Sequence, residues 1–411
     1  MDRPIITSML DLDFYKFTMA LLAWKQYRYV PVRYGFTNRS KGVHLGLELD
    51  LGELREQLEH VRTLRPTKTE LHYLRGTNEY GGRMFPEEFL EFFADNQVPD
   101  FELEQIGDDI RLEFPGDWPK AIWWETLALS IINELYFRKQ MAGLSRFEQE
   151  AVMAEGIRRL HGKIKVLKGR PDITFSDFGT RRRFSKEWQW RVIEALTEEL
   201  PGSFLGTSNV EAAMNFGLLP MGTSAHEKDM IMTGIMHGND DEIRESLNVT
   251  MDDWWNLFGQ GLSIALTDTF GTNYFFKAMT QQHAQDWKGL RHDSGAPIPF
   301  SNKAIKFYEG HGVDPREKLL VFSDGLDLPT MIKIADHCAE KIKHSYGWGT
   351  NLTNDLGFRA LSLVIKAIEA NGHGLVKLSD NLAKATGSPE DVEHFKRIFG
   401  HKVTTREECV Y

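Results

Sequence analysis

The sequence predicts an α/β protein in which a parallel barrel follows a separate N-terminal α+β domain. Strands and helices are mixed before residue 120, whereas short apolar strands alternate with helices after residue 172. Each of these later strands ends in a glycine-containing turn. Seven such strand-turn-helix units in series imply a parallel sheet, and their number favours closure into a barrel.

The N-terminal α+β domain is expected to cover residues 1–120. Helical periodicity, or a proline followed by glutamates, marks three segments as helices: 12–26, 49–64 and 86–94. Alternating apolar residues mark a strand and a hairpin: 30–37 and 101–114, with the hairpin turning at Gly107-Asp108.

Residues 121–355 are expected to hold a helical lead-in, which breaks near Gly143, and then the barrel with the active site. The strands with their terminal turns are 173–180, 203–209, 218–227, 262–272, 289–295, 319–325 and 344–351. Helical periodicity between them covers 186–200, 302–311 and 328–341. In a barrel the strand carboxyl ends carry the site, because the loops there vary without disturbing the core.

The last segment, 356–411, is expected to pack back on the N-terminal domain. Its pattern predicts a helix over 354–371, a strand over 374–378 and a short helix over 389–399.

Composition is that of an ordinary globular protein, with 41% hydrophobic and 26% charged residues in a chain of 411. A net charge of −10 argues against a general affinity for nucleic acid or acidic membranes, so an anionic ligand requires a local basic cluster. Cys338 and Cys409 lack metal-type spacing and suit a reducing cytosol. The most apolar run, 121–132, is too short to cross a bilayer. We expect a cytoplasmic protein.

The stretch 172–185 carries the first chemical signal. A short buried strand ends in Asp-Phe-Gly, and three arginines follow, beginning at Arg181. An aromatic face beside fixed cations suits a flat, negatively charged ring, because guanidinium groups pair with carboxylates through two parallel hydrogen bonds. A solvated basic turn beside a core phenylalanine explains the stretch equally well.

The other strand tips add charged residues and glycines. Gly325 and the turn 347–351 are candidate phosphate cradles, because glycine lets an anion approach backbone N–H groups closely. Asp293 and Asp324 are candidates for ribose hydroxyls or Mg²⁺. No strand-tip lysine suits a Schiff base, which argues against an aldolase. The residues therefore indicate a barrel enzyme for a phosphorylated sugar and a small anion.

Seven motifs in order closely resemble the nicotinate phosphoribosyltransferase family over almost the whole chain. They are Asp13-x-Tyr15-Lys16, Phe178-Gly179-x-Arg181, Gly206-Thr207-Ser208-Asn209, Gly222-Thr223-x-Ala225-His226-Glu227, Arg291-x-Asp293-Ser294-Gly295, Ser323-Asp324-Gly325 and Gly347-x-Gly349-Thr350-Asn351. The resemblance implies an irregular seven-stranded α/β barrel, TIM-like and of the quinolinate-phosphoribosyltransferase type. It also implies a step of NAD salvage: nicotinate, phosphoribosyl pyrophosphate, ATP and water give nicotinate mononucleotide, pyrophosphate, ADP and phosphate.

The resemblance assigns roles to individual residues. It implies that Phe178 stacks on the pyridine ring, with Tyr15 of a second subunit of a homodimer on the other face, and that Arg181 pairs with the nicotinate carboxylate. Arg291 and Asp293 join His226 as catalytic residues, with Arg291 and Mg²⁺ neutralising phosphates and Asp293 holding ribose hydroxyls. The remaining substrate-binding residues implied are Arg39, Thr207, Ser208, Asn209, Asp324, Gly325, Gly347, Gly349 and Thr350.

Three positions bear on mechanism and specificity. His226 resembles the histidine that ATP phosphorylates in relatives, although a histidine satisfied by turn hydrogen bonds is the structural alternative. Nicotinamide-using relatives carry a carboxylate at the position of Ser208, and the neutral hydroxyl here favours the acid. Ala296 stands where relatives usually carry Asp or Asn, so one polar contact is missing or supplied elsewhere.

Other functions remain open at this point. A nicotinamide- or quinolinate-specific phosphoribosyltransferase would share the fold, although quinolinate requires further basic residues. A non-catalytic sensor of phosphoribosyl metabolites is expected to lose the charged strand tips, which this chain keeps. A Mg²⁺-dependent phosphohydrolase using Asp293 and Asp324 would hydrolyse ATP without regard to nicotinate.

Overall fold

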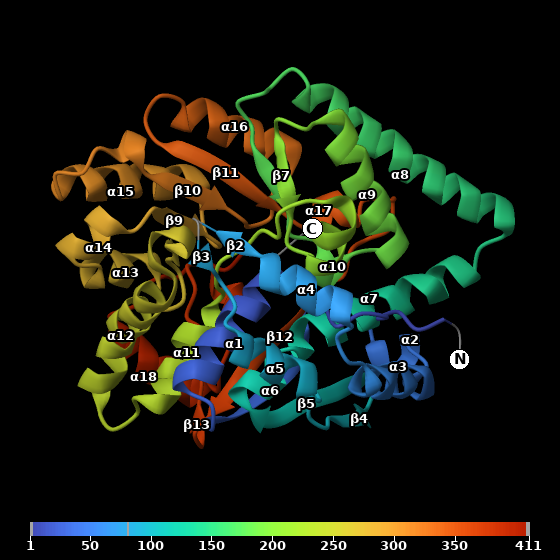
Figure 1. Ribbon diagram of the computed structural model, residues 1–411, viewed down its shortest axis with the longest axis horizontal. Helices are drawn as coiled ribbons and strands as arrows, with labels where there is room; N and C mark the ends of the chain where they lie inside the picture. The colour runs from blue at the N-terminus through green and yellow to red at the C-terminus, as the bar shows by residue number, and fades with distance from the viewer. Residues whose placement is uncertain (1–2, 80–81, 408–411) are drawn as a thin grey trace.

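The computed structural model describes residues 3–79 and 82–407. It is a mixed α/β structure in which a parallel sheet and its helices lie beside a separate N-terminal part (Figure 1). Cys409 lies outside the described residues, and Cys338 is a buried free cysteine. Within the described ranges, every helix is too short or too polar to cross a membrane.

The N-terminal part is built on an antiparallel sheet of order β13-β12-β1-β5-β4. Its strands are β1 (Pro31–Asn38), β4 (Glu102–Ile106), β5 (Asp109–Asp117), β12 (Leu363–Ala370) and β13 (His373–Gly374). The strand over 30–37 and the hairpin over 101–114 are confirmed. A small hairpin, β2 (Asn78–Glu79) with β3 (Gly82–Arg83), lies apart from this sheet.

The helices expected before residue 172 are also confirmed. They are α1 (Phe14–Gln26), α3 (Leu51–Thr63), α5 (Glu87–Asp95), α7 (Trp124–Ala142) and α8 (Arg146–Leu167), with the shorter α2 (Leu45–Glu48), α4 (Lys68–Gly76) and α6 (Trp118–Ala121) between them. The break near Gly143 is real, because this glycine caps α7 and the side chain of Ser145 then caps α8.

The second sheet is parallel and has the order β7-β6-β11-β10-β9-β8. Its strands are β6 (Phe175–Asp177), β7 (Phe204–Thr207), β8 (Ile264–Leu266), β9 (Gly289–His292), β10 (Leu319–Phe322) and β11 (Lys343–Trp348). The helices of this part are α9 (Lys186–Glu199), α10 (Val210–Phe216), α11 (His226–Ile235), α12 (Asp240–Phe258), α13 (Thr272–Ala278), α14 (Gln281–Asp286), α15 (Pro297–Gly310), α16 (Leu328–Cys338), α17 (Thr350–Thr353) and α18 (Pro389–Phe399). Short 3₁₀ turns occupy 180–182, 259–262, 315–317 and 382–384.

One of the seven expected strands does not form in the described chain. The segment 218–227 makes only a single parallel bridge, between Thr207 and Pro220. Proline has no N–H to donate, so the ladder beside β7 stops there. The parallel sheet is confirmed, and closure of seven strands into a barrel stays a prediction.

The helix expected over 354–371 is wrong. Residues 363–370 form β12, which pairs antiparallel with β1 from the other end of the chain. The strand expected over 374–378 is also shorter than predicted, since only β13 and an isolated bridge at Lys377 form there. The helix over 389–399 is confirmed as α18.

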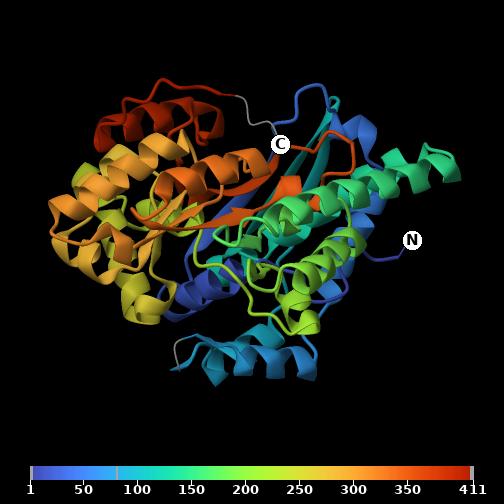
Figure 2. The ribbon, with the colours of Figure 1, turned by 90° about the horizontal axis from the view of Figure 1, so that it is seen from above.

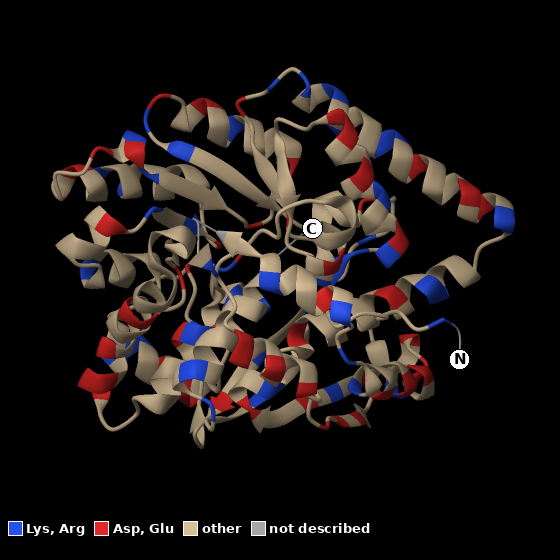
Figure 3. Cartoon of the chain, in the orientation of Figure 1, with Lys and Arg blue, Asp and Glu red and all other residues tan. Residues whose placement is uncertain are grey.

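Charges of both signs are interspersed along the outer helices, such as α8 and α9 (Figure 3). Seen from above, the C-terminal segment runs back across both parts of the molecule (Figure 2). Residues of β12, from the first sheet, line the same cavity as the residues at the strand ends of the second sheet.

Candidate functional site

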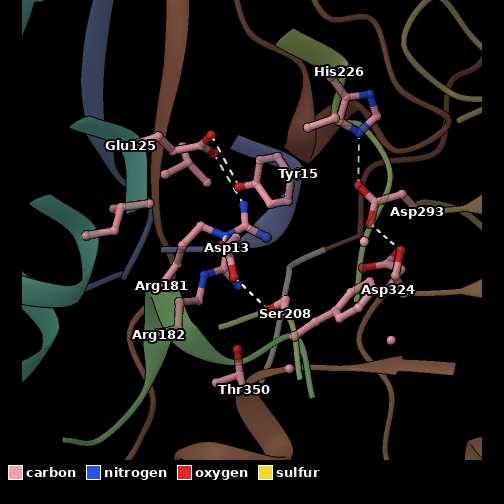
Figure 4. A pocket seen from close by; sticks show the side chains of 18 of the residues that line it. Asp13, Tyr15, Glu125, Arg181, Arg182, Ser208, His226, Asp293, Asp324 and Thr350 are labelled. Carbon is pink, nitrogen blue, oxygen red and sulfur yellow. Dashed lines mark hydrogen bonds and ion pairs between the residues drawn. The ribbon is translucent and has the colours of Figure 1, made fainter. Parts of the chain in front are cut away.

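A cavity of about 150 Å³ lies at the carboxyl ends of the parallel strands. The loops after β6, β7, β9, β10 and β11 form one side of it. The start of α1, the first turn of α7 and the strand β12 form the other side (Figure 4). Ligands of open α/β sheets bind outside the strand carboxyl ends, and this cavity has that position.

Most residues predicted for the site line this cavity. They are Tyr15, Arg39, Phe178, Arg181, Ser208, His226, Arg291, Asp293, Asp324, Gly325, Gly347, Gly349 and Thr350. Thr207 and Asn209 are not among its lining residues, and their assignment as substrate-binding residues stays a prediction. The Thr207 hydroxyl donates to Asp177 at 2.7 Å, and the Asn209 amide donates to Asp11 at 2.7 Å while its oxygen caps α10. Both side chains are satisfied inside the protein.

An aromatic residue lies at one end of the cavity, held by glycine. Phe178 follows β6, and its backbone N–H donates to the Trp348 carbonyl at 2.9 Å. The Phe178 ring lies directly against Gly347, where an added Cβ would be 2.3 Å from Cδ2 of the ring. Only a residue without a side chain fits beneath the ring at this position.

Tyr15 of the same chain also lines the cavity. The Arg181 guanidinium is 5.3 Å from the centroid of the Tyr15 ring, and the Tyr15 hydroxyl donates to Glu125 at 3.4 Å. α1 of this chain thus brings its own Tyr15 to the cavity, and a contribution of Tyr15 from a second subunit stays a prediction.

The Arg181 guanidinium faces two carboxylates. Its Nε is 3.0 Å from Asp13 and its Nη1 is 3.3 Å from Glu125. Burial by itself would lower the pKa of Arg181, but Tyr15, Asp13 and Glu125 raise it, so the guanidinium is charged at every physiological pH. The Ser208 hydroxyl donates to Asp13 at 2.6 Å (Figure 4). The neutral hydroxyl of Ser208 therefore does not by itself keep negative charge away from this end of the cavity, because the Asp13 carboxylate lies next to it.

Behind Arg181 lies a fully buried ammonium group. Lys16 is 2.6 Å from Glu125 and 2.5 Å from Glu227, and its side chain has no exposed surface. Glu227 also accepts from the Tyr34 hydroxyl at 2.8 Å. Burial would raise the pKa of Glu125, but Lys16 and the other neighbouring cations hold it well below its usual range. Glu125 is therefore ionised and connects Lys16 to Arg181.

At the other end of the cavity, hydrogen bonds select one tautomer of His226. The Thr269 hydroxyl donates its only proton to Asp229 at 2.9 Å. Its oxygen, 3.0 Å from Nδ1 of His226, must therefore accept a hydrogen bond, so Nδ1 carries the ring proton. Burial and then the charge of Lys377 lower the pKa of His226 to about 4. The ring is neutral at physiological pH, with the lone pair on Nε2.

Nε2 of His226 lies among groups that could surround a cation. Nε2 is 2.9 Å from Asp293 and 3.6 Å from Asp268, and ligand atoms of all three residues lie within 4.8 Å of one another. However, the Lys377 ammonium is 2.8 Å from Nε2 and 3.2 Å from Asp268. An internal cation already lies among these atoms, so they do not fit a resident divalent ion.

Basic residues and glycines line a third part of the cavity. Arg291 donates to the Ser224 carbonyl at 2.8 Å, and Arg39 donates to the Lys384 carbonyl at 3.2 Å. Lys384 in turn pairs with Asp324. Gly325 has φ of +55°, a left-handed conformation that favours glycine. Arginine, lysine and a glycine turn at one place suit a phosphate-rich ligand.

Several charged residues of the lining were not assigned to the site from the sequence, among them Glu125, Lys366, Lys377 and Lys384. The three lysines lie in the C-terminal segment, where a helix was expected in place of β12. A single lysine inside the apolar run 363–370 was the available signal, because a lysine there needs a partner or an opening. Ala296, where the sequence departs from its relatives, is the residue before α15 and supplies no side-chain cap.

Two family models match the chain. Residues 10–133 match the nicotinate phosphoribosyltransferase N-terminal domain, and residues 173–403 match the nicotinate phosphoribosyltransferase family. A nicotinate phosphoribosyltransferase from Porphyromonas gingivalis has a similar structure, with 30% identity and a TM-score of 0.86, over 96% of this chain and 100% of that one. One from Vibrio cholerae has 32% identity and a TM-score of 0.87, over 98% of this chain and 95% of that one. A putative nicotinate phosphoribosyltransferase from Saccharomyces cerevisiae has 28% identity and a TM-score of 0.82, over 98% of this chain and 100% of that one.

Proposed function

The chain belongs to the nicotinate phosphoribosyltransferase family, and from this premise we propose that the cavity joins nicotinate to phosphoribosyl pyrophosphate. Its function is the transfer of phosphoribose to nicotinate in NAD salvage. One observation supports this use of the cavity most directly. A ring and a guanidinium, Phe178 and Arg181, line the same cavity as further arginines and the glycine turns of the strand tips.

In this proposal the pyridine ring of nicotinate stacks on Phe178, with Tyr15 on the same side of the cavity as Arg181. The carboxylate of nicotinate points to Arg181. The 5′-phosphate of the ribosyl donor binds at Gly325 and the turn 347–351, because both line the cavity and glycine turns suit an anion. The ribose hydroxyls bind Asp293.

The transfer itself needs little proton movement. The ring nitrogen of nicotinate forms a bond to the anomeric carbon, and the bond from that carbon to pyrophosphate breaks. Catalysis therefore rests on holding the two reactants in line and on neutralising the leaving group. Arg291 and Arg39 line the cavity at the strand tips and are the proposed counter-charges.

Mg²⁺ fits this scheme only as an ion that arrives with the phosphates. Such an ion keeps most of its water and needs one or two protein carboxylates. Asp293 and Asp324 line the cavity and would supply them. When bound it would reduce the negative charge of the leaving pyrophosphate. The group formed by His226, Asp268 and Asp293 is not its proposed site, because Lys377 lies there.

We propose that ATP phosphorylates His226. Nε2 carries the lone pair and can attack the γ-phosphorus, forming an N–P bond as the bond to ADP breaks. Nδ1 keeps its proton and donates it to the Thr269 oxygen, while the Thr269 hydroxyl donates its own proton to Asp229, so the positive charge that develops on the ring is stabilised. Lys377 is placed to neutralise the incoming phosphoryl group. Water later accepts the phosphoryl group, so ATP and water become ADP and phosphate.

The test is product formation from phosphoribosyl pyrophosphate and Mg²⁺ with nicotinate or nicotinamide, each with and without ATP. We expect wild type to form nicotinate mononucleotide and to be stimulated by ATP. His226→Ala is expected to retain the basal rate and to lose the stimulation, because no other group described in the cavity offers an unprotonated imidazole. His394→Ala, an exposed histidine on α18, is the matched control and should respond to ATP like wild type. ATP stimulation that survives in His226→Ala would overturn the phosphohistidine.

Gly347→Ala is expected to raise the KM for nicotinate about 10- to 100-fold, the range that corresponds to the usual cost of overpacking. The new methyl group would overlap the Phe178 ring, which must leave its position. Gly162→Ala, where an added Cβ meets nothing within 4 Å, is the control and should leave the KM as it is. An unchanged KM in Gly347→Ala would mean that Phe178 does not stack on nicotinate.

The proposal also extends to architecture and location. We place the segment 218–222 as the seventh strand position, since its bridge at Pro220 is parallel to β7. A cytoplasmic location is in keeping with the free thiol of Cys338. A homodimer is compatible with the site, but Tyr15 does not require one.

A further inference from the structure

Lys366 is a charged residue in the middle of an apolar strand, and it faces the cavity. Leu363, Val364 and Lys366 of β12 line the cavity, and Val364 and Lys366, two apart on the strand, share a face. The backbone there is fixed by antiparallel pairing with β1, where Lys366 lies opposite Gly35. The Lys366 side chain is 15% exposed, whereas Lys16 behind it is fully buried. Lys366 is thus the ammonium group of this wall that a ligand can reach.

The charges around Arg181 show why a second cation is needed. Arg181 carries one positive charge and faces two carboxylates, Asp13 at 3.0 Å and Glu125 at 3.3 Å. A ligand carboxylate would therefore enter a region with an excess of negative charge if Arg181 acted alone. Lys366 is 3.4 Å from Glu125 and restores the balance. Lys16 also pairs with Glu125, at 2.6 Å, but its single charge is shared with Glu227.

We propose that Lys366 is a second binding residue for the carboxylate of nicotinate, beside Arg181, and that it favours the acid over the amide. The inference rests on the proposed function of the cavity. An ammonium group attracts a carboxylate and gains much less from the neutral amide of nicotinamide. Neither the motifs nor the resemblance pointed to this lysine, because it lies on a strand that the sequence analysis assigned to a helix.

The electrostatic surroundings of Lys366 give the proposal a pH signature. Burial lowers the pKa of Lys366 to about 8, with Glu125 opposing the shift and Arg181, Lys377 and Lys16 adding to it. Below this pKa the ammonium is charged and binds the ligand carboxylate. Above it the charge is lost in the free enzyme, so the affinity for nicotinate falls as the pH rises through about 8.

The experiment compares wild type with Lys366→Met, Lys366→Arg and Lys343→Met. Lys343 is an exposed lysine on β11 and gives a matched control away from the cavity. The KM for nicotinate, the KM for phosphoribosyl pyrophosphate and the inhibition constant of nicotinamide are measured from about pH 6.5 to about pH 9.5, a range that spans the titration. Nicotinamide serves as the neutral probe of the same ring site.

Lys366→Met is expected to raise the KM for nicotinate about 10- to 100-fold at neutral pH, the loss of one charge-assisted hydrogen bond. The KM for phosphoribosyl pyrophosphate and the inhibition constant of nicotinamide should stay unchanged. In wild type the KM for nicotinate should rise above about pH 8. Lys366→Arg should abolish that rise, because a guanidinium keeps its proton. Lys343→Met should behave like wild type.

Two outcomes would overturn the inference while leaving the proposed function intact. One is an active Lys366→Met enzyme with the wild-type KM for nicotinate. The other is a parallel change in all three constants, which would indicate a structural role. If Lys366→Met does not fold, Lys366→Arg tests the inference. A rise of its KM for nicotinate at alkaline pH equal to that of wild type would exclude Lys366 as the source of the rise. A wild type that forms no nicotinate mononucleotide would instead overturn the proposed function itself.

Discussion

Lys16→Met is expected to lower the free energy of unfolding by about 3–5 kcal/mol, the usual result of removing one partner from a buried ion pair. The ammonium lies between Glu125 at 2.6 Å and Glu227 at 2.5 Å, and none of its side chain is exposed. Without it, two buried carboxylates lose their closest cation. Urea unfolding followed by circular dichroism measures the change.

The control is Lys120→Met, which removes a partly exposed lysine 3.2 Å from Asp117. Exposed pairs of this kind contribute about 0–1 kcal/mol, so this variant should unfold close to wild type. Adding Glu227→Gln to Lys16→Met should recover part of the loss, because it removes one uncompensated charge. Equal effects of Lys16→Met and Lys120→Met would show that Lys16 is not essential to the buried network.

Arg181→Ala is expected to lower kcat/KM for nicotinate by about two to three orders of magnitude, the range found when one partner of a desolvated charge pair is truncated. The variant loses the guanidinium that faces the ligand carboxylate. It also leaves Asp13 and Glu125 without the cation that lies 3.0 Å and 3.3 Å from them. Both changes disfavour an anionic ring. Steady-state kinetics with nicotinate as the varied substrate measure the effect.

Arg158→Ala is the matched control, since Arg158 is exposed on α8 and pairs only with its own helix neighbour Glu155 among the ion pairs described. It should keep the wild-type kcat/KM. The KM for phosphoribosyl pyrophosphate in Arg181→Ala should change far less than the KM for nicotinate. A similar loss for both substrates would argue that Arg181 supports the cavity as a whole and does not bind the carboxylate.

Local patterns were sufficient for most helices. The periodic apolar residues of α1 and the capped start of α8 determine these helices through neighbours three and four residues apart. Strands that repeat with a glycine turn were also recognisable, because β10 is a short apolar run and a glycine follows closely after β6, β9 and β11. The ordered strand-tip motifs identified the family and most of the cavity lining for the same reason: they are short and contiguous.

Pairing between distant segments was not readable in this way. Residues 363–370 contain β-branched residues and a helical spacing of apolar ones, so the local pattern is compatible with either element. These residues form a strand because they pair with β1, with Lys366 opposite Gly35 and Val364 opposite Thr37. β1 lies near the other end of the chain, so a local pattern does not reveal the pairing. At Pro220 the local pattern was misleading in the other direction. The apolar run there looks like a strand, but the proline allows only a single bridge to β7.

The sequence by itself determined the family and most of the helices, because each of these depends on residues close together in the chain. Only the tertiary structure decided which charges meet. Arg181 faces both Asp13 and Glu125, Lys377 lies against His226, and Lys366 enters the cavity from β12. Electrostatic interactions act through distances in space, and the partners in each of these groups come from segments far apart in sequence.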